Sequence, residues 1–259
     1  MVKDKWRVWD KDKKYGEVFY KRAVGKLPEM ESSRAAAKYV AKLVKANYTI
    51  LDVGCGAGHY LTSLDNILRA PFSYHGIDAT AYYVQLAKKA FAKNVNGNLL
   101  RKSYVFETGD IFNLKLTDNY ADVVMCNNVL LHLPSIEKPI RELWRVTKRF
   151  LVVRTLIGKT SFRIKQINPP EEYGRDGEPR NFHFLNIYSQ EYISRLAGNL
   201  GGVKKYRLIE DKDYNPDNIG RSGDAKEKKS HNMTVIVNGM QVNNYIIQPW
   251  KFLIIEKEI

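Results

Sequence analysis

Apolar residues fall into two alternating patterns along the chain. Short apolar runs occur near residues 50–53, 72–77, 104–106, 121–126 and 150–156. Runs of this length are typical of buried strands in a parallel sheet. The segments between them carry apolar residues at every third or fourth position, which predicts helices packed on that sheet. The pattern therefore predicts an α/β fold with a doubly wound, mostly parallel sheet and right-handed crossovers.

Two segments in the second half interrupt this alternation. Residues 158–188 show no clean period, and residues 211–244 combine a polar stretch with a hairpin pattern around Asn238-Gly239. Asn-Gly suits the type I′ turn of a hairpin. We expect both segments to be insertions, the first one forming a cap over a functional site. Strands are predicted again near 203–209 and 252–255.

Capping residues predict where two helices begin. Ser32 or Ser33 is expected to cap a helix that runs to about Ala46, and Ser189 to cap a helix that stops at Gly201.

A glycine-rich turn follows the first predicted strand. Gly54, Gly56 and Gly58 come directly after the run that contains Asp52. Because glycine adopts positive φ and lets a ligand approach the backbone, a strand, such a turn and a helix form a nucleotide-type site. A dinucleotide fingerprint would require glycine where His59 stands, so an NAD-dependent dehydrogenase is disfavoured. A P-loop is excluded because no G-K-[ST] follows.

The string Leu51-Asp52-Val53-Gly54-Cys55-Gly56-Ala57-Gly58 resembles the first motif of class I S-adenosylmethionine-dependent methyltransferases. The resemblance implies a Rossmann-like fold with an antiparallel edge strand, and S-adenosyl-L-methionine as cofactor. It also implies that Asp52 and the loop from Gly54 to Gly58, with Cys55 in it, hold the amino-acid end of the cofactor.

Two further acids match this family's pattern in order. Asp78, followed by Ala79, ends the second predicted strand 20 residues past Gly58 and would accept hydrogen bonds from the ribose. Its alternative role is to cap the helix that begins near Thr80. Asp110 and Ile111 resemble the family's adenine-binding motif, with Asp110 as acceptor and Ile111 as an apolar wall.

The end of the fourth predicted strand resembles the family's fourth motif. Asn127 stands where it would meet the methionine portion of the cofactor. A histidine side chain ordinarily titrates near neutral pH, so His132 is the candidate catalytic base that would take a proton from the acceptor. The alternative is a histidine that only packs on a helix start, since many members of this family rely on positioning and use no base.

Residues 1–30 mix aromatic and basic residues, and residues 31–259 are predicted to form the methyltransferase domain. In the resembled family such a leader often covers the cofactor as a lid; the alternative is an arm on the domain surface. The candidate acceptor-binding residues come from the leader, the fifth strand and the first insertion. They are Tyr15, Tyr20, Arg154 and His183.

Composition and charge restrict the class of protein and the kinds of partner that are expected. Hydrophobic residues make up 44% of the 259 residues, enough for a sizeable core. The sequence has neither an apolar run of membrane-spanning length nor a signal-like start, so a cytoplasmic protein is expected. Cys55 and Cys126 do not have the spacing of metal ligands, so we expect two reduced thiols and no metal. The net charge is +14, and residues 1–50 carry 13 Lys and Arg against 6 Asp and Glu.

The function predicted from these observations is methyl transfer from S-adenosylmethionine to an oxygen or nitrogen atom of a small-molecule acceptor. RNA methylation is the alternative, because the basic leader would attract nucleic acid. A non-catalytic protein that binds S-adenosylmethionine is the other alternative that the sequence leaves open.

Overall fold

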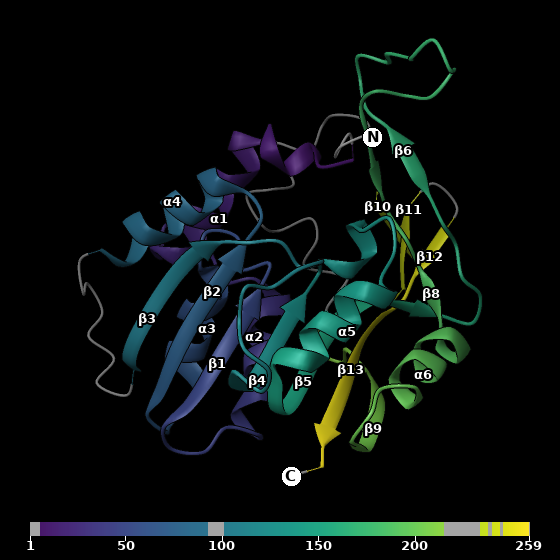
Figure 1. Ribbon diagram of the computed structural model, residues 1–259. Coiled ribbons are helices and arrows are strands. Elements are labelled where there is room, and N and C mark those ends of the chain that lie inside the picture. Colours follow the sequence, from purple (N-terminus) through teal and green to yellow (C-terminus); the bar gives the residue numbers. More distant parts are fainter. Residues whose placement is uncertain (1–5, 93–100, 215–233, 238–239, 244–245, 259) are drawn as a thin grey trace.

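A twisted central sheet organises the molecule (Figure 1). The computed structural model describes residues 6–92, 101–214, 234–237, 240–243 and 246–258. The strand order is β3-β2-β1-β4-β5-β13-β9, and the first five strands run parallel. Their bounds are β1 Tyr48–Val53, β2 Phe72–Asp78, β3 Arg101–Thr108, β4 Ala121–Asn127, β5 Thr147–Gly158, β9 Val203–Glu210 and β13 Trp250–Lys257. This order confirms the doubly wound, mostly parallel sheet.

The sheet ends in two antiparallel ladders. β13 pairs antiparallel with β5, and β9 pairs antiparallel with β13, so β9 is the edge strand. The chain order reverses between β1 and β4, where the first strand meets the fourth. In open α/β sheets, ligands bind at such a switch point beyond the carboxyl ends of the strands.

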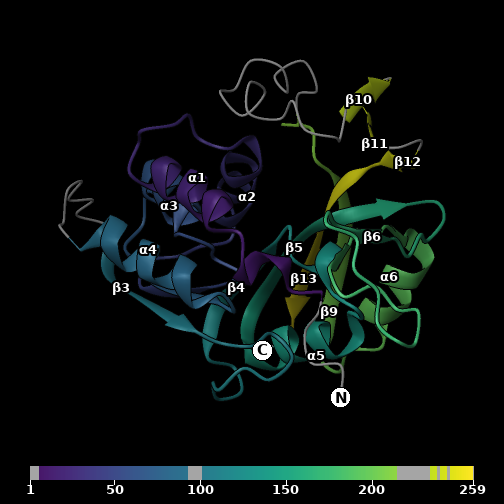
Figure 2. The ribbon, with the colours of Figure 1, turned by 90° about the horizontal axis from the view of Figure 1, so that it is seen from above.

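Helices cover both faces of the sheet (Figures 1 and 2). One face carries α2 (Glu31–Ala41), α3 (His59–Ile67) and α4 (Ala81–Phe91), and the other carries α5 (Glu137–Val146) and α6 (Gln190–Gly198). Because side chains alternate along a strand, Ile50 packs on the first face, and Leu51 and Val53 on the second. None of the helices that the structure describes is long and apolar enough to cross a membrane.

The two capping predictions had different outcomes. Ser189 caps α6, because its side chain accepts a hydrogen bond from the backbone N–H of Tyr192. The prediction for Ser32 and Ser33 was wrong. Helix α2 begins at Glu31 without a side-chain cap, and both serines are buried inside it. The Ser63 hydroxyl donates to the Ser33 hydroxyl at 2.8 Å, so these side chains join α2 to α3.

The leader and both insertions contain short regular elements. The leader forms the 3-10 turn η1 (Val8–Asp10) and the helix α1 (Lys13–Ala23), which the mixed pattern of residues 1–30 did not indicate. The first insertion contains an antiparallel pair and a short strand beside β5: β6 (Lys165–Ile167), β7 (Phe182–Phe184) and β8 (Tyr188–Ser189).

The second insertion contains the predicted hairpin. β10 (Thr234–Val237) pairs antiparallel with β11 (Met240–Asn243), and Val237 lies opposite Met240. The turn residues Asn238 and Gly239 lie outside the described residues. A third strand, β12 (Ile246–Gln248), joins β11 and was not predicted from the sequence.

A buried ion pair joins β5 to the segment that follows β9. The Nε and Nη2 atoms of Arg154 both lie 2.7 Å from Oδ2 of Asp211, and the two side chains are 3% and 1% exposed. The Arg154 guanidinium also lies over the ring of Trp250, 4.1 Å from its centroid. Such a pair holds its segments together only while both charges are present.

We expect Asp211→Asn to lower the free energy of unfolding by roughly 3–5 kcal/mol, because it leaves the Arg154 charge buried without its counterion. Asp213→Asn is the matched control. Asp213 pairs with Lys38 at the surface, so its loss should change stability by less than about 1 kcal/mol. Urea unfolding of both variants tests this, and equal stabilities would show that the buried pair contributes nothing beyond a surface pair.

Candidate active site

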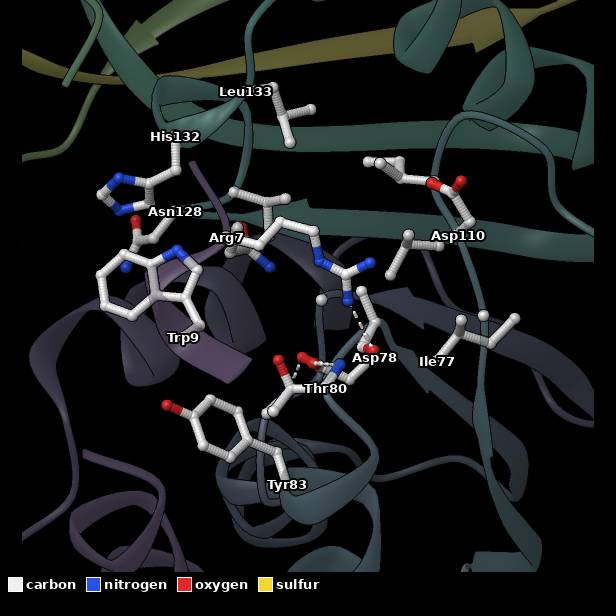
Figure 3. A pocket seen from close by; sticks show the side chains of 18 of the residues that line it. Arg7, Trp9, Ile77, Asp78, Thr80, Tyr83, Asp110, Asn128, His132 and Leu133 are labelled. Carbon is white, nitrogen blue, oxygen red and sulfur yellow. Dashed lines mark hydrogen bonds between the residues drawn. The ribbon is translucent and has the colours of Figure 1, made fainter. Parts of the chain in front are cut away.

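A cavity of about 420 Å³ lies beyond the carboxyl ends of β1, β2 and β4 (Figure 3). Its floor includes Gly54, Asp78 and Asn127, each from the end of a different strand. The leader closes the other side with Trp6, Arg7, Trp9 and Tyr15. The cavity thus lies at the switch point of the sheet, between the strand ends and the leader.

The glycine turn needs its glycines for geometric reasons. Gly54, Gly56 and Gly58 have φ of 88°, 55° and 84°, a region that side-chain-bearing residues rarely adopt. A Cβ on Gly54 would lie 2.2 Å from Cγ2 of Val129. Gly54 and Gly56 line the cavity, whereas Gly58 does not; it precedes α3 and packs near Phe91.

The Asp78 carboxylate connects this turn to the next one. Its Oδ2 accepts from the backbone N–H of Gly56 and its Oδ1 from that of Thr80, both at 2.8 Å. Burial raises the pKa of this carboxyl, and the two backbone hydrogen bonds oppose the shift. Thr80 itself occupies the N-cap position of α4. Asp78 therefore lines the cavity and also supports the helix start, so the two predicted roles are compatible in geometry.

Asp52 and Cys55 lie outside the cavity lining. Asp52 is on the same strand face as Ile50, because both are even positions of one strand. Its carboxylate is 1% exposed and accepts a hydrogen bond from the Tyr74 hydroxyl at 2.7 Å. Burial raises the pKa of this carboxyl to about 7. The Cys55 thiol is also buried, and the structure places neither side chain in contact with the cavity.

The remaining predicted cofactor residues line the cavity: Ala79, Asp110, Ile111 and Asn127. The Asp110 side chain is exposed, and its Oδ1 accepts from the backbone N–H of Phe112. Asn127 is 4% exposed, and neither atom of its amide group has a hydrogen-bond partner among the described residues. An unpaired buried amide destabilises a protein by about 1–3 kcal/mol, and here both atoms of the group are available for a hydrogen bond to a molecule in the cavity.

The leader is attached to the end of β2 and the start of α4. An Arg7 Nη2 group donates to the Ala79 carbonyl at 2.8 Å. The Thr80 hydroxyl donates to the Asp10 carboxylate at 3.0 Å. Trp6, Arg7 and Trp9 line the cavity and were missed among the candidates, although the aromatic cluster near the start of the chain was the available signal. Tyr15 also lines it, whereas Tyr20 lies outside under the ammonium of Lys89.

His132 lies in the turn η2 (Leu130–His132) and faces the leader (Figure 3). Its ring lies 4.8 Å from that of Trp9, centroid to centroid. Nδ1 is 2.9 Å from the carbonyl oxygen of Phe184. Because a carbonyl only accepts, Nδ1 carries the proton and Nε2 has the free lone pair in the neutral ring. Burial lowers the pKa of His132 to about 4, so this neutral form prevails at pH 7.

Arg154 and His183 do not line the cavity. Arg154 donates from Nη1 to Oδ1 of Asn128 at 2.5 Å, and Asn128 does line it. Asn128 has φ of 59° and was missed in the sequence, where nothing distinguishes it from its neighbour. The ring centroids of His183 and Trp9 lie 6.4 Å apart, and Nδ1 of His183 is 3.0 Å from Oδ1 of Asn168.

Part of the chain is similar in sequence to known proteins. Residues 44–162 match the model of a methyltransferase domain family. The uncharacterized methyltransferase YcgJ of Bacillus subtilis is 30% identical over 112 residues, which are 42% of this chain and 41% of that protein. The 2-phytyl-1,4-naphtoquinone methyltransferase of Nostoc punctiforme is 22% identical over 64% of each chain.

Solved structures share the fold. Phosphoethanolamine N-methyltransferase 2 of Haemonchus contortus, solved with S-adenosyl-L-methionine, superposes with a TM-score of 0.62 at 12% identity, over 99% of this chain and 60% of that one. The matched region spans about two fifths of the length of the first relatives, 41% and 40%. The comparisons thus show that residues 44–162 resemble a methyltransferase domain, and the solved structures confirm the Rossmann-like fold.

The tautomer of His132 is directly measurable. We expect long-range ¹H–¹⁵N correlation spectra to show a neutral ring protonated at Nδ1 at pH 7, and to show no second protonation until the pH approaches about 4. Because the folded pKa lies below the unfolded value of about 6.5, the neutral ring stabilises the fold above pH 6.5, and this contribution is lost as the pH falls toward 4. Protonation at Nε2 at pH 7 would contradict the assignment.

Proposed function

We propose that this chain, whose residues 44–162 match the methyltransferase domain family, transfers a methyl group from S-adenosyl-L-methionine to an oxygen or nitrogen atom of a small molecule. The observation that carries the proposal is the cavity, where the glycine turn and Asp78 meet Asn127 at the switch point, and the amide group of Asn127 is unpaired among the described residues. The quinone acceptor in the name of the Nostoc relative supports a small-molecule substrate.

The lining residues fit the parts of the cofactor. Gly54, Gly56 and Asn127 would hold the amino-acid end, and Asp110 with Ile111 would hold the adenine. Asp78 would hold the ribose. A carboxylate accepts about four hydrogen bonds, so Asp78 retains capacity after its two backbone bonds. Asp52 and Cys55 would act through the conformation of the turn, because their side chains lie outside the cavity.

S-adenosylmethionine supplies a methyl group on a positively charged sulfur. The chain supplies orientation, which accounts for roughly 7–11 kcal/mol of the barrier in well-aligned systems. The leader excludes water through Trp6 and Trp9, and a dry site favours the dispersal of charge as the methyl group moves. His132 would receive the acceptor's proton at Nε2, since Nδ1 is already protonated.

Cofactor binding gives the first test. Calorimetry should show binding of S-adenosylhomocysteine and no binding of NADH. Asp78→Ala should weaken the former by about 1–3 kcal/mol, because the ribose loses its acceptor. Asp213→Ala, a surface change, should leave the affinity unchanged. Circular dichroism reports whether the Asp78 variant is folded; a folded variant with unchanged affinity would remove Asp78 from the ribose site.

The acceptor class has a separate test, which also addresses RNA and a non-catalytic role. The protein is incubated with methyl-labelled S-adenosylmethionine and cell extract separated into small molecules, RNA and protein. We expect label in the small-molecule fraction. Label in RNA, lost steeply with added salt, would favour the alternative suggested by the net charge of +14. Binding of S-adenosylhomocysteine without any transfer would favour the non-catalytic alternative.

A further inference from the structure

We propose that the methyl acceptor is an uncharged, planar aromatic compound with a hydroxyl group, which is the atom that receives the methyl. This inference rests on the proposed function and specifies the substrate class of the same cavity. It is carried by the ring surfaces of Trp9 and His132, the position of the charged lining residues, and the free lone pair on Nε2 of His132.

The cavity has two chemically different sides. Figure 3 shows Asp78, Ile77 and Asp110 on one side and Trp9, Asn128 and His132 on the other. The first side holds the groups assigned to the nucleoside. The second side, here called the acceptor side, is therefore the space left for the methyl acceptor.

A row of aromatic rings runs from the acceptor side to the glycine turn, where Phe19 and His59 lie next to Gly56. The ring of Trp9 lies 4.8 Å from that of His132 and 5.3 Å from that of Tyr15. The row continues from Tyr15 to Phe19 at 4.4 Å, and from Phe19 to His59, which stack at 4.4 Å with 8° between their planes. A row of ring faces and edges binds planar aromatic ligands through stacked and edge-on contacts.

The described residues of the acceptor side offer no charge to a ligand. The charged side chains among the described lining residues are Arg7, Asp78 and Asp110, and Figure 3 places the two acids on the nucleoside side, with the Arg7 guanidinium pointing toward them. Burial lowers the pKa of both His59 and His132, so these rings are neutral at pH 7. A charged acceptor would lose its hydration here without gaining a counterion, whereas a neutral aromatic one would not.

His132 selects a hydroxyl on that ring. Its Nδ1–H donates to Phe184, so Nε2 presents a hydrogen-bond acceptor and not a donor. In the transfer step, the hydroxyl oxygen forms a bond to the methyl carbon. The carbon–sulfur bond breaks and its electron pair stays on sulfur. The hydroxyl proton moves to Nε2, and the products are an aryl methyl ether and S-adenosylhomocysteine.

Calorimetry with four matched probes tests the class, each added to protein saturated with S-adenosylhomocysteine. The probes are 2-naphthol, naphthalene, trans-decahydro-2-naphthol and 2-naphthoate. We expect 2-naphthol to bind at least tenfold more tightly than the saturated alcohol and the carboxylate, and at least fivefold more tightly than naphthalene. If the saturated alcohol binds as tightly as 2-naphthol, the acceptor is not selected for an aromatic ring. If 2-naphthoate binds more tightly than 2-naphthol, the acceptor is not selected for lack of charge. If none of the four probes binds, the whole inference is overturned.

Two variants locate the effect. Trp9→Leu should abolish the preference for 2-naphthol over its saturated analogue. His132→Phe should abolish the preference for 2-naphthol over naphthalene. Phe162→Leu, which changes an exposed ring outside the cavity lining, should preserve both preferences. Preferences that persist in the first two variants would overturn the inference. If the unaltered protein does not bind S-adenosylhomocysteine, the proposed function itself is rejected. Failure of the inference and failure of the proposed function are therefore distinguishable.

Discussion

The two hydrogen bonds that the Asp78 carboxylate accepts hold the candidate site together. They join the glycine turn after β1 to the turn after β2, so one side chain fixes the relative position of two strand ends. Hydrogen bonds to a charged acceptor are about twice as strong as neutral ones. The leader, which forms the roof of the cavity, attaches to the same place through Ala79 and Thr80, so its position depends on this junction as well.

Much of the fold could be predicted because the short apolar runs alternate regularly with segments of helical period. The five parallel strands, the hairpin and the start of α6 follow from local patterns. The alternation of side chains along a strand also predicts where Asp52 points, because Ile50 and Asp52 must lie on the same face of β1. The motif position of Asp52 instead predicts a contact with the cofactor, which the burial of its side chain does not support. Short elements such as β6 and β12 have too few residues to show a period.

Contacts between distant residues account for the rest. Asn128 reaches Arg154, which is 26 positions further along the chain, and Arg154 reaches Asp211, another 57 positions on. Ser32 and Ser33 look like capping residues locally, but Tyr60 and Ser63 of another helix bind their hydroxyls. Partners this far apart leave no local pattern, so only the folded structure assigns these polar side chains to the core.

The position of the leader has a practical consequence for protein production. Because Trp6 and Arg7 line the cavity, an affinity tag inserted directly ahead of Trp6 would lie next to the cavity. Such an extension would compete with the roof for space or pull it open, and ligand affinities would then depend on the vector chosen. A tag placed after β13, on the far side of the sheet order from β1 and β2, avoids this interference.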